Sequence, residues 1–252
     1  MNGKTVVFAN QKGGVGKTTT AANLGAYVAE AGKKVLLVDF DPQGNLSSCV
    51  GADRNQAGIY EVIVGKMEIH QALQHSAMEG MDILSSNINL TGANVELINL
   101  EDREYYLKNS LEKIKDEYDY IFIDCPPSLG VLTLNGLTAA DSVIIPLQCE
   151  YFALEGLSLL LQTVKTVQKE LNKSLVIDGI LFTMYDSRTR LANEVVQEVS
   201  GYFKDKVFRT IIPRNIRLSE APSHGVPVNL YDKTCIGARS YERLAGEVLK
   251  RV

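Results

Sequence analysis

The sequence predicts an α/β fold with a mostly parallel central sheet and helices on both of its faces. Short β-branched runs alternate along the chain with helix-length stretches, and several of those runs are apolar on both faces. Strands of a parallel sheet have this composition because helices cover both of their faces. The chain has 252 residues, the length of one α/β domain, so we expect a single domain over residues 1–252.

Seven runs are predicted to be strands. They are TVVFAN (5–10), KVLLVDFD (34–41), MDILSS (81–86), YDYIFIDCPP (118–127), DSVIIPL (141–147), VIDGILFTMYD (176–186) and VFRTIIP (207–213). Helical patterns cover residues 18–32, 95–115, 154–171 and 190–203. Gly32 is expected to end the first of these helices.

The last stretch, SYERLAGEVLKRV, predicts a helix with one apolar face. That face carries Tyr241, Leu244, Val248, Leu249 and Val252. Such a stripe either docks on its own domain or lies on a membrane surface, and docking is the more common arrangement. We therefore expect this helix to pack against the rest of the chain.

Composition excludes several classes of protein. Hydrophobic residues make up 45% and charged residues 22% of the chain, as in ordinary globular proteins. No apolar run approaches the roughly 18 residues that a membrane span requires, and the N-terminus lacks the apolar core of a secretory signal. We expect a cytoplasmic protein with no membrane partner. The four cysteines lie far apart in the sequence, which predicts free thiols.

Charge is unevenly distributed along the chain. The formal net charge is -4, which by itself argues against a nucleic-acid partner. Residues 201–252, however, contain ten lysines or arginines and only five acidic residues. From charge alone, this segment is interpreted as a solvated basic face.

A glycine-rich loop follows the first predicted strand and begins a helix. In QKGGVGKTTT (11–20), Gly13, Gly14 and Gly16 lack the Cβ atom that would keep the backbone away from a phosphate, so successive N–H groups can surround its oxygens. Lys17 is expected to reach the β- and γ-phosphates, and the Thr18 hydroxyl to bind Mg²⁺. The strand before the loop and the helix after it make a nucleotide site a better interpretation than an empty glycine turn.

This loop departs from the usual pattern G-x-x-x-x-G-K-[ST]. Gln11 occupies the position of the first glycine, and an additional lysine, Lys12, follows it. The loop is therefore either a damaged nucleotide site or one that uses two lysines.

Carboxylates follow two of the predicted strands. Asp124 ends YIFID, and Asp39 and Asp41 end VLLVDFD. Ligands of open α/β sheets bind at the carboxyl ends of the strands, so Asp124 is expected to help hold the metal. Asp39 and Asp41 lie on the same side if the strand continues, and one of them is expected to orient the attacking water.

Four motifs carry a resemblance to a known family. KGGVGKTT, DFDPQGN, IDCPPSLG and IPRNIRLSEAPSHGVPV occur in this order and cover nearly the whole chain. Together they resemble the ParA/Soj family of chromosome- and plasmid-partitioning ATPases. The resemblance implies a P-loop NTPase of the deviant Walker A type, with ATP and Mg²⁺ as cofactors. Slow hydrolysis is expected from the residues themselves, because no glutamine or arginine is evident beside the water-orienting carboxylate.

The same resemblance assigns roles to individual residues. It implies that Lys12 reaches across a nucleotide-sandwich homodimer to the phosphates of the other subunit, that Asp41 positions the water, and that Asp124 is the Walker B acid. The segment 126–130 corresponds to switch II. The residues expected to contact the nucleotide are Lys12, Gly13, Gly14, Val15, Gly16, Lys17, Thr18, Thr19, Pro213 and Asn215.

Partners also follow from the resemblance. Members of the family bind double-stranded DNA without sequence preference, through arginines whose positions match Arg188 and Arg217 in this chain. Arg190 is a plausible third contact. A ParB/Spo0J-type protein is expected to stimulate hydrolysis, and the chain is expected to associate with the nucleoid.

Other functions remain open from the sequence. A MinD-like ATPase that binds membranes would need an exposed C-terminal amphipathic helix. A reductase resembling the nitrogenase iron protein would need cluster ligands, for which Cys125 is the one tempting residue. A ligase or amidotransferase of the wider fold would need a substrate-binding insertion, and none is obvious.

Overall fold

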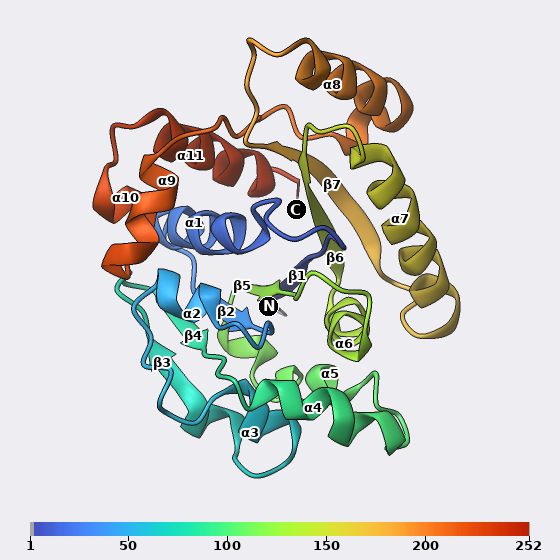
Figure 1. Cartoon of the computed structure of the whole chain (residues 1–252). Coiled ribbons are helices and arrows are strands. Elements are labelled where there is room, and N and C mark those ends of the chain that lie inside the picture. Colours follow the sequence, from blue (N-terminus) through green and yellow to red (C-terminus); the bar gives the residue numbers. More distant parts are fainter. Residues whose placement is uncertain (1–2, 252) are drawn as a thin grey trace.

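A computed structural model describes residues 3–251, which form a twisted sheet with helices on both faces (Figure 1). The order of the strands is β3-β4-β2-β5-β1-β6-β7. Every neighbouring pair is parallel except β3 and β4, which are antiparallel. The predicted fold class is confirmed. The strands are β1 (Lys4–Phe8), β2 (Val35–Asp39), β3 (Leu73–His75), β4 (Met81–Leu84), β5 (Tyr120–Asp124), β6 (Ser142–Gln148) and β7 (Val176–Thr183).

Helices connect the strands and cover the sheet. They are α1 (Lys17–Glu30), α2 (Asn45–Cys49), α3 (Ile59–Ile63), α4 (Leu90–Glu96), α5 (Tyr106–Leu111), α6 (Val131–Ala139), α7 (Ala153–Glu170), α8 (Arg190–Phe203), α9 (Arg217–Glu220), α10 (Val228–Tyr231) and α11 (Ile236–Val248). Five short 3-10 turns are η1 (Ile69–Ala72), η2 (Leu97–Asn99), η3 (Lys115–Glu117), η4 (Lys204–Lys206) and η5 (Ala221–His224).

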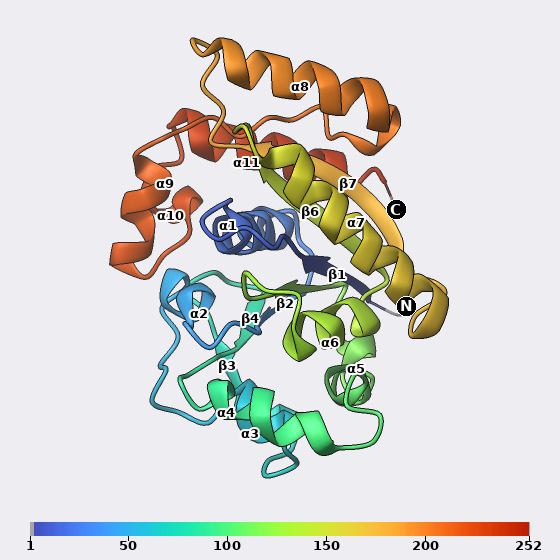
Figure 2. The same cartoon turned by 45° about the vertical axis from the view of Figure 1, so that its right-hand side comes forward.

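Alternate residues of the central strands pack into two separate cores. In β5, Ile121 and Ile123 belong to the core under α3 to α8, whereas Tyr120 and Phe122 belong to the core under α1, α2 and α9 to α11. Successive side chains of a strand point to opposite faces, so a strand buried on both sides has to be apolar throughout. Figures 1 and 2 show the two helical layers from different sides.

The first helix ends where the sequence predicts. Gly32 has φ +82°, a left-handed conformation that glycine adopts without steric cost. The Gly32 N–H donates to the Ala29 carbonyl at 2.8 Å, and the Lys33 N–H donates to the Val28 carbonyl at 3.3 Å. These two bonds satisfy carbonyls that the end of the helix leaves without partners.

The C-terminal helix packs on its own domain, as predicted. Tyr241, Leu244 and Val248 are buried in the core that contains α1, and Leu249 packs against it. Val252 lies outside the described residues. The apolar face that a MinD-like membrane helix would expose is therefore part of the core. Within residues 3–251, the structure contains no helix that is long and apolar enough to cross a membrane.

The predicted strand at 207–213 is wrong. This segment runs beside β7 and makes only isolated bridges, between Ile180 and Val207 and between Tyr185 and Pro213. The amides of Arg209 and Thr210 donate instead to the carboxylate of Glu247 on α11, at 2.9 and 3.1 Å. A regular ladder cannot form because this side chain captures two consecutive N–H groups.

The predicted helix over 95–115 is also wrong, because it is broken between η2 and α5. Asp102 has φ +51° in the break, which interrupts right-handed helix. Leu100, the apolar residue of the sequence NLEDRE, is 45% exposed, so this stretch has no apolar face to bury. The three-residue strand β3 was not predicted, since LQH has no recognisable strand pattern.

We predict that Glu247→Ala lowers the free energy of unfolding by about 2 kcal/mol, because two backbone amides lose a charged acceptor. Glu242→Ala is the matched control: it makes the same change in helix propensity at an exposed position of α11. Urea denaturation of both variants measures the difference. Equal midpoints and slopes for the two would show that Glu247 does not hold the segment beside β7.

Candidate nucleotide-binding site

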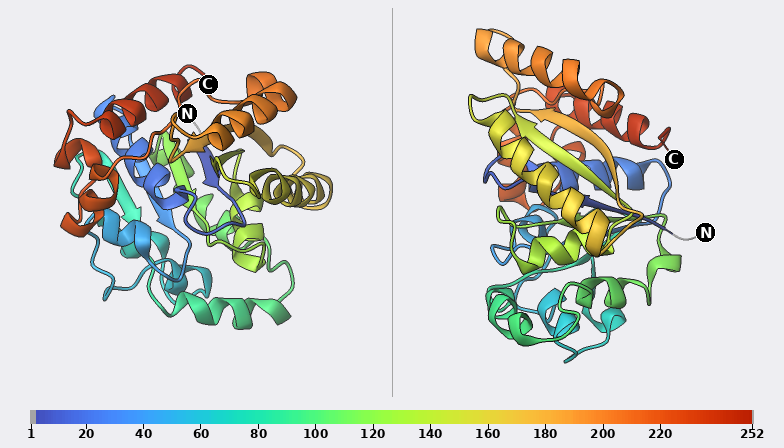
Figure 3. Two further views of the ribbon diagram at one scale, coloured as in Figure 1. Left: turned by 45° about the horizontal axis from the view of Figure 1, so that its top comes forward. Right: turned by 90° about the vertical axis from the view of Figure 1, so that its right-hand side faces the viewer.

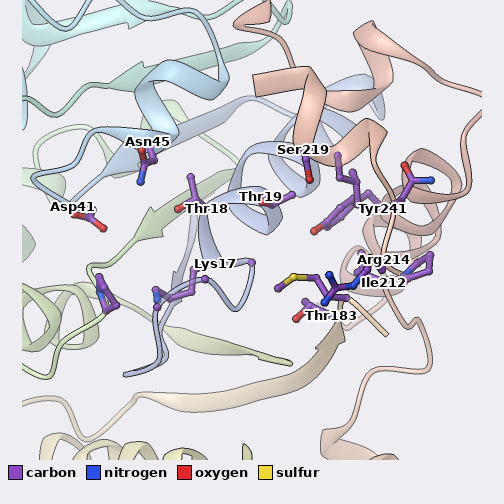
Figure 4. Close-up of a pocket in the computed structure, with 18 of the residues that line it drawn as sticks. Lys17, Thr18, Thr19, Asp41, Asn45, Thr183, Ile212, Arg214, Ser219 and Tyr241 are labelled. Atoms are coloured by element: carbon purple, nitrogen blue, oxygen red, sulfur yellow. The ribbon is translucent and has the colours of Figure 1, made fainter. Parts of the chain in front are cut away.

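A cavity of about 370 Å³ lies at the carboxyl ends of the strands, between the glycine-rich loop and the segment after residue 211 (Figure 4). Nine predicted site residues line it, although they come from distant parts of the sequence. They are Gly13, Gly14, Gly16, Lys17, Thr18, Thr19, Asp41, Pro213 and Asn215. Of the other predicted nucleotide contacts and metal ligands, Lys12, Val15 and Asp124 lie outside the lining.

The loop between β1 and α1 is held from both sides. The Asn10 side chain donates to the Pro146 carbonyl on β6 at 2.7 Å and accepts the Lys12 N–H at 3.0 Å. The Thr183 hydroxyl, at the end of β7, donates to the Val15 carbonyl at 2.7 Å. Gly16, with φ +86°, turns the backbone into α1. The side chain of Val15 is buried, so any nucleotide contact of this residue has to come from its backbone.

Lys17 points into the site and is bound by the loop itself. Its ammonium donates to the carbonyls of Asn10 at 3.0 Å and Lys12 at 3.2 Å. Burial lowers the pKa of Lys17, while the negative charge of Asp124 acts in the opposite direction. A cation held in this way is ready to bind phosphate oxygens without reorganisation of the loop.

Lys12 takes a different direction. Its ammonium forms an ion pair with the Glu150 carboxylate in the connection between β6 and α7, and the two side chains are 40% and 48% exposed. The two lysines of one short loop therefore have separate environments: Lys17 is buried inside the cavity, and Lys12 lies on the surface beside it.

Thr18 and Asp124 lie together below the loop. The Thr18 hydroxyl donates to Asp124 Oδ2 at 2.6 Å. Asp124 Oδ1 is buried and has no hydrogen-bond partner among the described residues. Burial, reinforced by the negative charge of Asp39, raises the pKa of Asp124 to about 8. A hydroxyl and a carboxylate with an unused buried oxygen fit Mg²⁺, which prefers oxygen ligands.

The two acidic residues after β2 have separate positions. Asp39 is fully buried, and its Oδ2 accepts hydrogen bonds from the backbone N–H and the hydroxyl of Ser47, both at 2.7 Å, so it anchors α2. Burial raises the pKa of Asp39 to about 6. Asp41 instead lines the cavity, with Asn45 beside it (Figure 4). Of the two, Asp41 is therefore the one that faces the cavity.

The other end of the cavity has an apolar wall, most of which was not predicted from the sequence. Ile212, Leu218 and Tyr241 line it beside Pro213 and Asn215. Figure 4 shows Ile212 and Tyr241 on one side of Lys17 and Thr18, with Asp41 on the other. The cavity therefore has a charged end suited to phosphates and an apolar end suited to a base. Tyr241 follows the loop by more than 200 residues, and nothing local in the sequence indicates its role.

Comparison with known proteins identifies the family. A family model described as "AAA domain" matches residues 3–177. The chain is 63% identical over 249 residues to the chromosome-partitioning ATPase Soj of Treponema pallidum, covering 99% of this chain and 98% of that protein. It is 55% identical over 249 residues to the sporulation initiation inhibitor protein Soj of Bacillus subtilis, covering 98% of both. The chain belongs to the ParA/Soj family of chromosome-partitioning ATPases.

A solved structure supports the same fold. It is a Mycobacterium smegmatis protein named cobyrinic acid a,c-diamide synthase, with a bound ATP analogue and magnesium. It is 42% identical to this chain, with a TM-score of 0.88, and the match covers 98% of this chain and 94% of that one. The two relatives named Soj are more similar in sequence to this chain, at 63% and 55% identity, than this synthase is.

The arginines predicted to bind DNA lie outside the cavity, and each one pairs with carboxylates of its own chain. Arg188 makes two hydrogen bonds with Asp186, at 2.8 and 2.6 Å. Arg217 lies 2.8 Å from Glu220 and 3.4 Å from Asp232. Phosphates at these arginines would have to compete with bound carboxylates.

Other predictions about side chains can be compared with the structure. The four cysteines are free thiols, as predicted. Cys125 is 1% exposed, which leaves it unable to bridge two subunits through a cluster, as the reductase alternative would require.

We predict that Asp124→Asn stabilises the ligand-free protein increasingly as the pH rises. The raised pKa of Asp124 means that the native state keeps its proton more tightly than the unfolded chain, so the wild type loses stability between about pH 4 and pH 8. Asparagine carries no such charge. The exposed Asp116→Asn is the control, and urea unfolding across this pH range without Mg²⁺ is the measurement. A constant difference at all pH values would contradict the assignment.

Proposed function

We propose that this chain is a Mg²⁺-dependent ATPase that dimerises around two ATP molecules and binds double-stranded DNA without sequence preference. It segregates a chromosome or plasmid through cycles of binding and release, and a ParB/Spo0J-type protein stimulates its slow hydrolysis. It works in the cytoplasm, on the nucleoid. Family membership and the solved structure with an ATP analogue and magnesium support this proposal.

The observation that carries the proposal is the divergence of the two lysines. Lys17 donates to the loop carbonyls inside the cavity, whereas Lys12 pairs with the exposed Glu150. A lysine that leaves its own nucleotide site is free to enter the site of another subunit. ATP then joins two subunits, because each triphosphate takes Lys17 from one and Lys12 from the other.

Each part of the site has a step in hydrolysis. The loop amides and Lys17 bind the phosphates, and Lys12 of the second subunit adds charge near the γ-phosphate. Thr18 and Asp124 would hold Mg²⁺, which would supply positive charge to the phosphate oxygens. Asp41 orients the attacking water. Phosphoryl transfer depends mainly on positioning and charge, so a site completed only by dimerisation hydrolyses little ATP as a monomer.

DNA binding in this proposal depends on the dimer. Arg188 and Arg217 provide a modest basic patch, since their carboxylate partners reduce its charge. Two joined copies of the patch raise the effective affinity without any new contact. ATP therefore controls DNA retention through dimerisation, and added salt weakens it.

We predict that Lys12→Ala keeps ATP binding by the monomer within about threefold of wild type and weakens the ATP-dependent dimer more than tenfold, since one charged phosphate contact is lost from each site. Light scattering gives the dimer fraction, and fluorescent ATP gives the affinity.

Lys113→Ala is the matched control, because Lys113 also forms a surface ion pair, with Glu68 at 3.1 Å. The cross-subunit role fails if Lys12→Ala still dimerises with ATP as the control does.

We predict that Arg217→Glu lowers DNA affinity in the presence of ATP at least tenfold and leaves the ATP-dependent dimer intact, because a phosphate contact is replaced by repulsion. Lys169→Glu, on the exposed side of α7, makes the same change in net charge. Fluorescence anisotropy with a labelled duplex measures both variants. Equal retention of DNA by the two would place the DNA-binding surface elsewhere.

A further inference from the structure

Helix α4 has apolar side chains on two opposite faces. Its inner face belongs to the core and carries Leu90, Ala93 and Leu97. Its outer face continues from the turn before the helix into η2 after it, and carries Ile88, Val95 and Ile98. These three side chains, which we call the outer stripe, are between 54% and 71% exposed. A helix that is apolar on all sides is normally buried, so the outer stripe is suited to contact with another protein segment.

Exposed apolar side chains are concentrated in this part of the chain. Leu100 follows the outer stripe by two residues, so residues 88–100 contain four of the large exposed apolar side chains. Phe152 and Leu159 are also exposed, but they line a shallow pocket beside Lys12, where the proposed dimer forms. The outer stripe shares no residue with that pocket or with the nucleotide cavity. Neither of those sites therefore accounts for its exposure.

The start of α4 is fixed to the end of the sheet. The Ser86 N–H, between β4 and α4, donates to the Ser47 hydroxyl oxygen at 2.9 Å, and this hydroxyl donates to Asp39 at the end of β2. The carbonyl of Ser85 accepts the Ile59 N–H at 2.8 Å. Figures 1, 2 and 3 show α4 at the periphery of the molecule, beside α3. A stripe held on a fixed helix binds a partner without the entropy cost of ordering a loop first.

Three carboxylates accompany the outer stripe along the chain. Glu96 lies between Val95 and Ile98, and Glu101 and Asp102 follow Ile98 directly after η2. All three acidic residues are exposed, and none forms an ion pair with another described residue. The apolar surface therefore has negative charge beside it.

The cations of this region do not neutralise these carboxylates. The Lys66 ammonium lies 5.1 Å from the centroid of the Tyr60 ring, and the Tyr60 hydroxyl donates to Glu96 at 3.0 Å, but Lys66 forms no ion pair with Glu96. Arg103 pairs instead with its neighbour Glu104, at 2.9 Å. The negative charge beside the stripe is therefore available to a partner.

This charge discriminates between possible partners. Carboxylates without cationic partners repel DNA phosphates and the anionic surface of a membrane. A two-fold contact between two copies of the stripe would place the carboxylates of one copy beside those of the other, because such a contact joins the same surface of both subunits. Lysines or arginines next to an apolar face complement the surface. A basic protein segment is therefore the partner that fits it.

We propose that the outer stripe of α4 is a docking surface for an amphipathic helix of a partner protein, whose apolar side chains are flanked by lysines or arginines. Such a helix packs its apolar face against the stripe through side chains three or four residues apart. Its cations lie beside Glu96, Glu101 and Asp102. The inference goes beyond the proposed function, because it requires neither DNA nor the ATP-dependent dimer.

The test uses the full chain with ADP and a fluorescein-labelled helical peptide as the probe. In this peptide, leucines at every third or fourth position form one face and lysines form the rest. Fluorescence anisotropy measures its affinity. The wild type is expected to bind it at least tenfold more tightly than a peptide of the same charge in which serines replace the leucines, because apolar anchors contribute most of the affinity of such contacts.

A first double variant removes the apolar contact. Val95→Ser/Ile98→Ser is expected to bind the leucine peptide at least tenfold more weakly than the wild type. Its matched control is Leu191→Ser/Leu230→Ser, which truncates two exposed aliphatic side chains on α8 and α10. The control is expected to bind as the wild type does. Urea denaturation checks that both variants are folded.

A second double variant removes charge and leaves the apolar side chains in place. Glu101→Gln/Asp102→Asn is expected to bind the leucine peptide roughly three- to tenfold more weakly than the wild type, with a smaller dependence on salt. Glu112→Gln/Asp116→Asn is the control, because it neutralises two exposed carboxylates outside residues 88–104.

The inference is overturned if the wild type does not distinguish the two peptides, or if either double variant binds the leucine peptide as its control does. Light scattering with ADP and sedimentation with anionic vesicles test the other occupants. Self-association or vesicle binding that is lost only in Val95→Ser/Ile98→Ser would assign the surface to a second copy or to lipid, and would also overturn the inference. These measurements contain no DNA and no ATP-dependent dimer, so they do not depend on whether the proposed function holds.

Discussion

Two side chains from outside the glycine-rich loop determine where the loop lies. Asn10 ties it to β6 through the Pro146 carbonyl, and Thr183 ties it to β7 through the Val15 carbonyl. Both bonds are buried, and leaving such a group without a partner costs about 1–3 kcal/mol. The loop cannot turn without breaking at least one of them. The different directions of the Lys12 and Lys17 side chains therefore depend on the sheet, and not on the loop sequence alone.

The same edge of the sheet concentrates negative charge. Asp39 and Asp124 are paired in register on neighbouring strands, and both are fully buried. Burial raises the pKa of both carboxyls and the negative charge of nearby carboxylates adds to this shift, whereas Lys17 acts in the opposite direction on Asp124. Ser47 donates hydrogen bonds to the Asp39 carboxylate, but Asp124 Oδ1 has no hydrogen-bond partner among the described residues. The site is therefore arranged for an additional cation, and it gains most when that cation binds at Asp124.

Strand ends were the most informative part of the sequence. Asp41 and Asp124 could be placed because carboxyl ends of parallel strands share one edge. Asn10 and Thr183 also lie at the carboxyl ends of predicted strands, so the same rule would have placed both side chains beside the glycine-rich loop. The position of Tyr241 and the irregular backbone at 207–213 could not be predicted from the sequence, because both depend on how α11 packs. Tyr241 lines the cavity, and Glu247 accepts two backbone amides, only once that helix is in place.

The ion pair of Lys12 with Glu150 is compatible with a transfer of Lys12 to another subunit. Both side chains are about half exposed, and such surface pairs contribute only about 0–1 kcal/mol. An ammonium enclosed with a triphosphate interacts more strongly, because the surroundings are less polar and the ligand carries more charge. In the proposed dimer, Lys12 therefore gives up little when it leaves Glu150. So weak a pair is compatible with the surface position of Lys12 in the single subunit and with its contact to a phosphate in the proposed dimer.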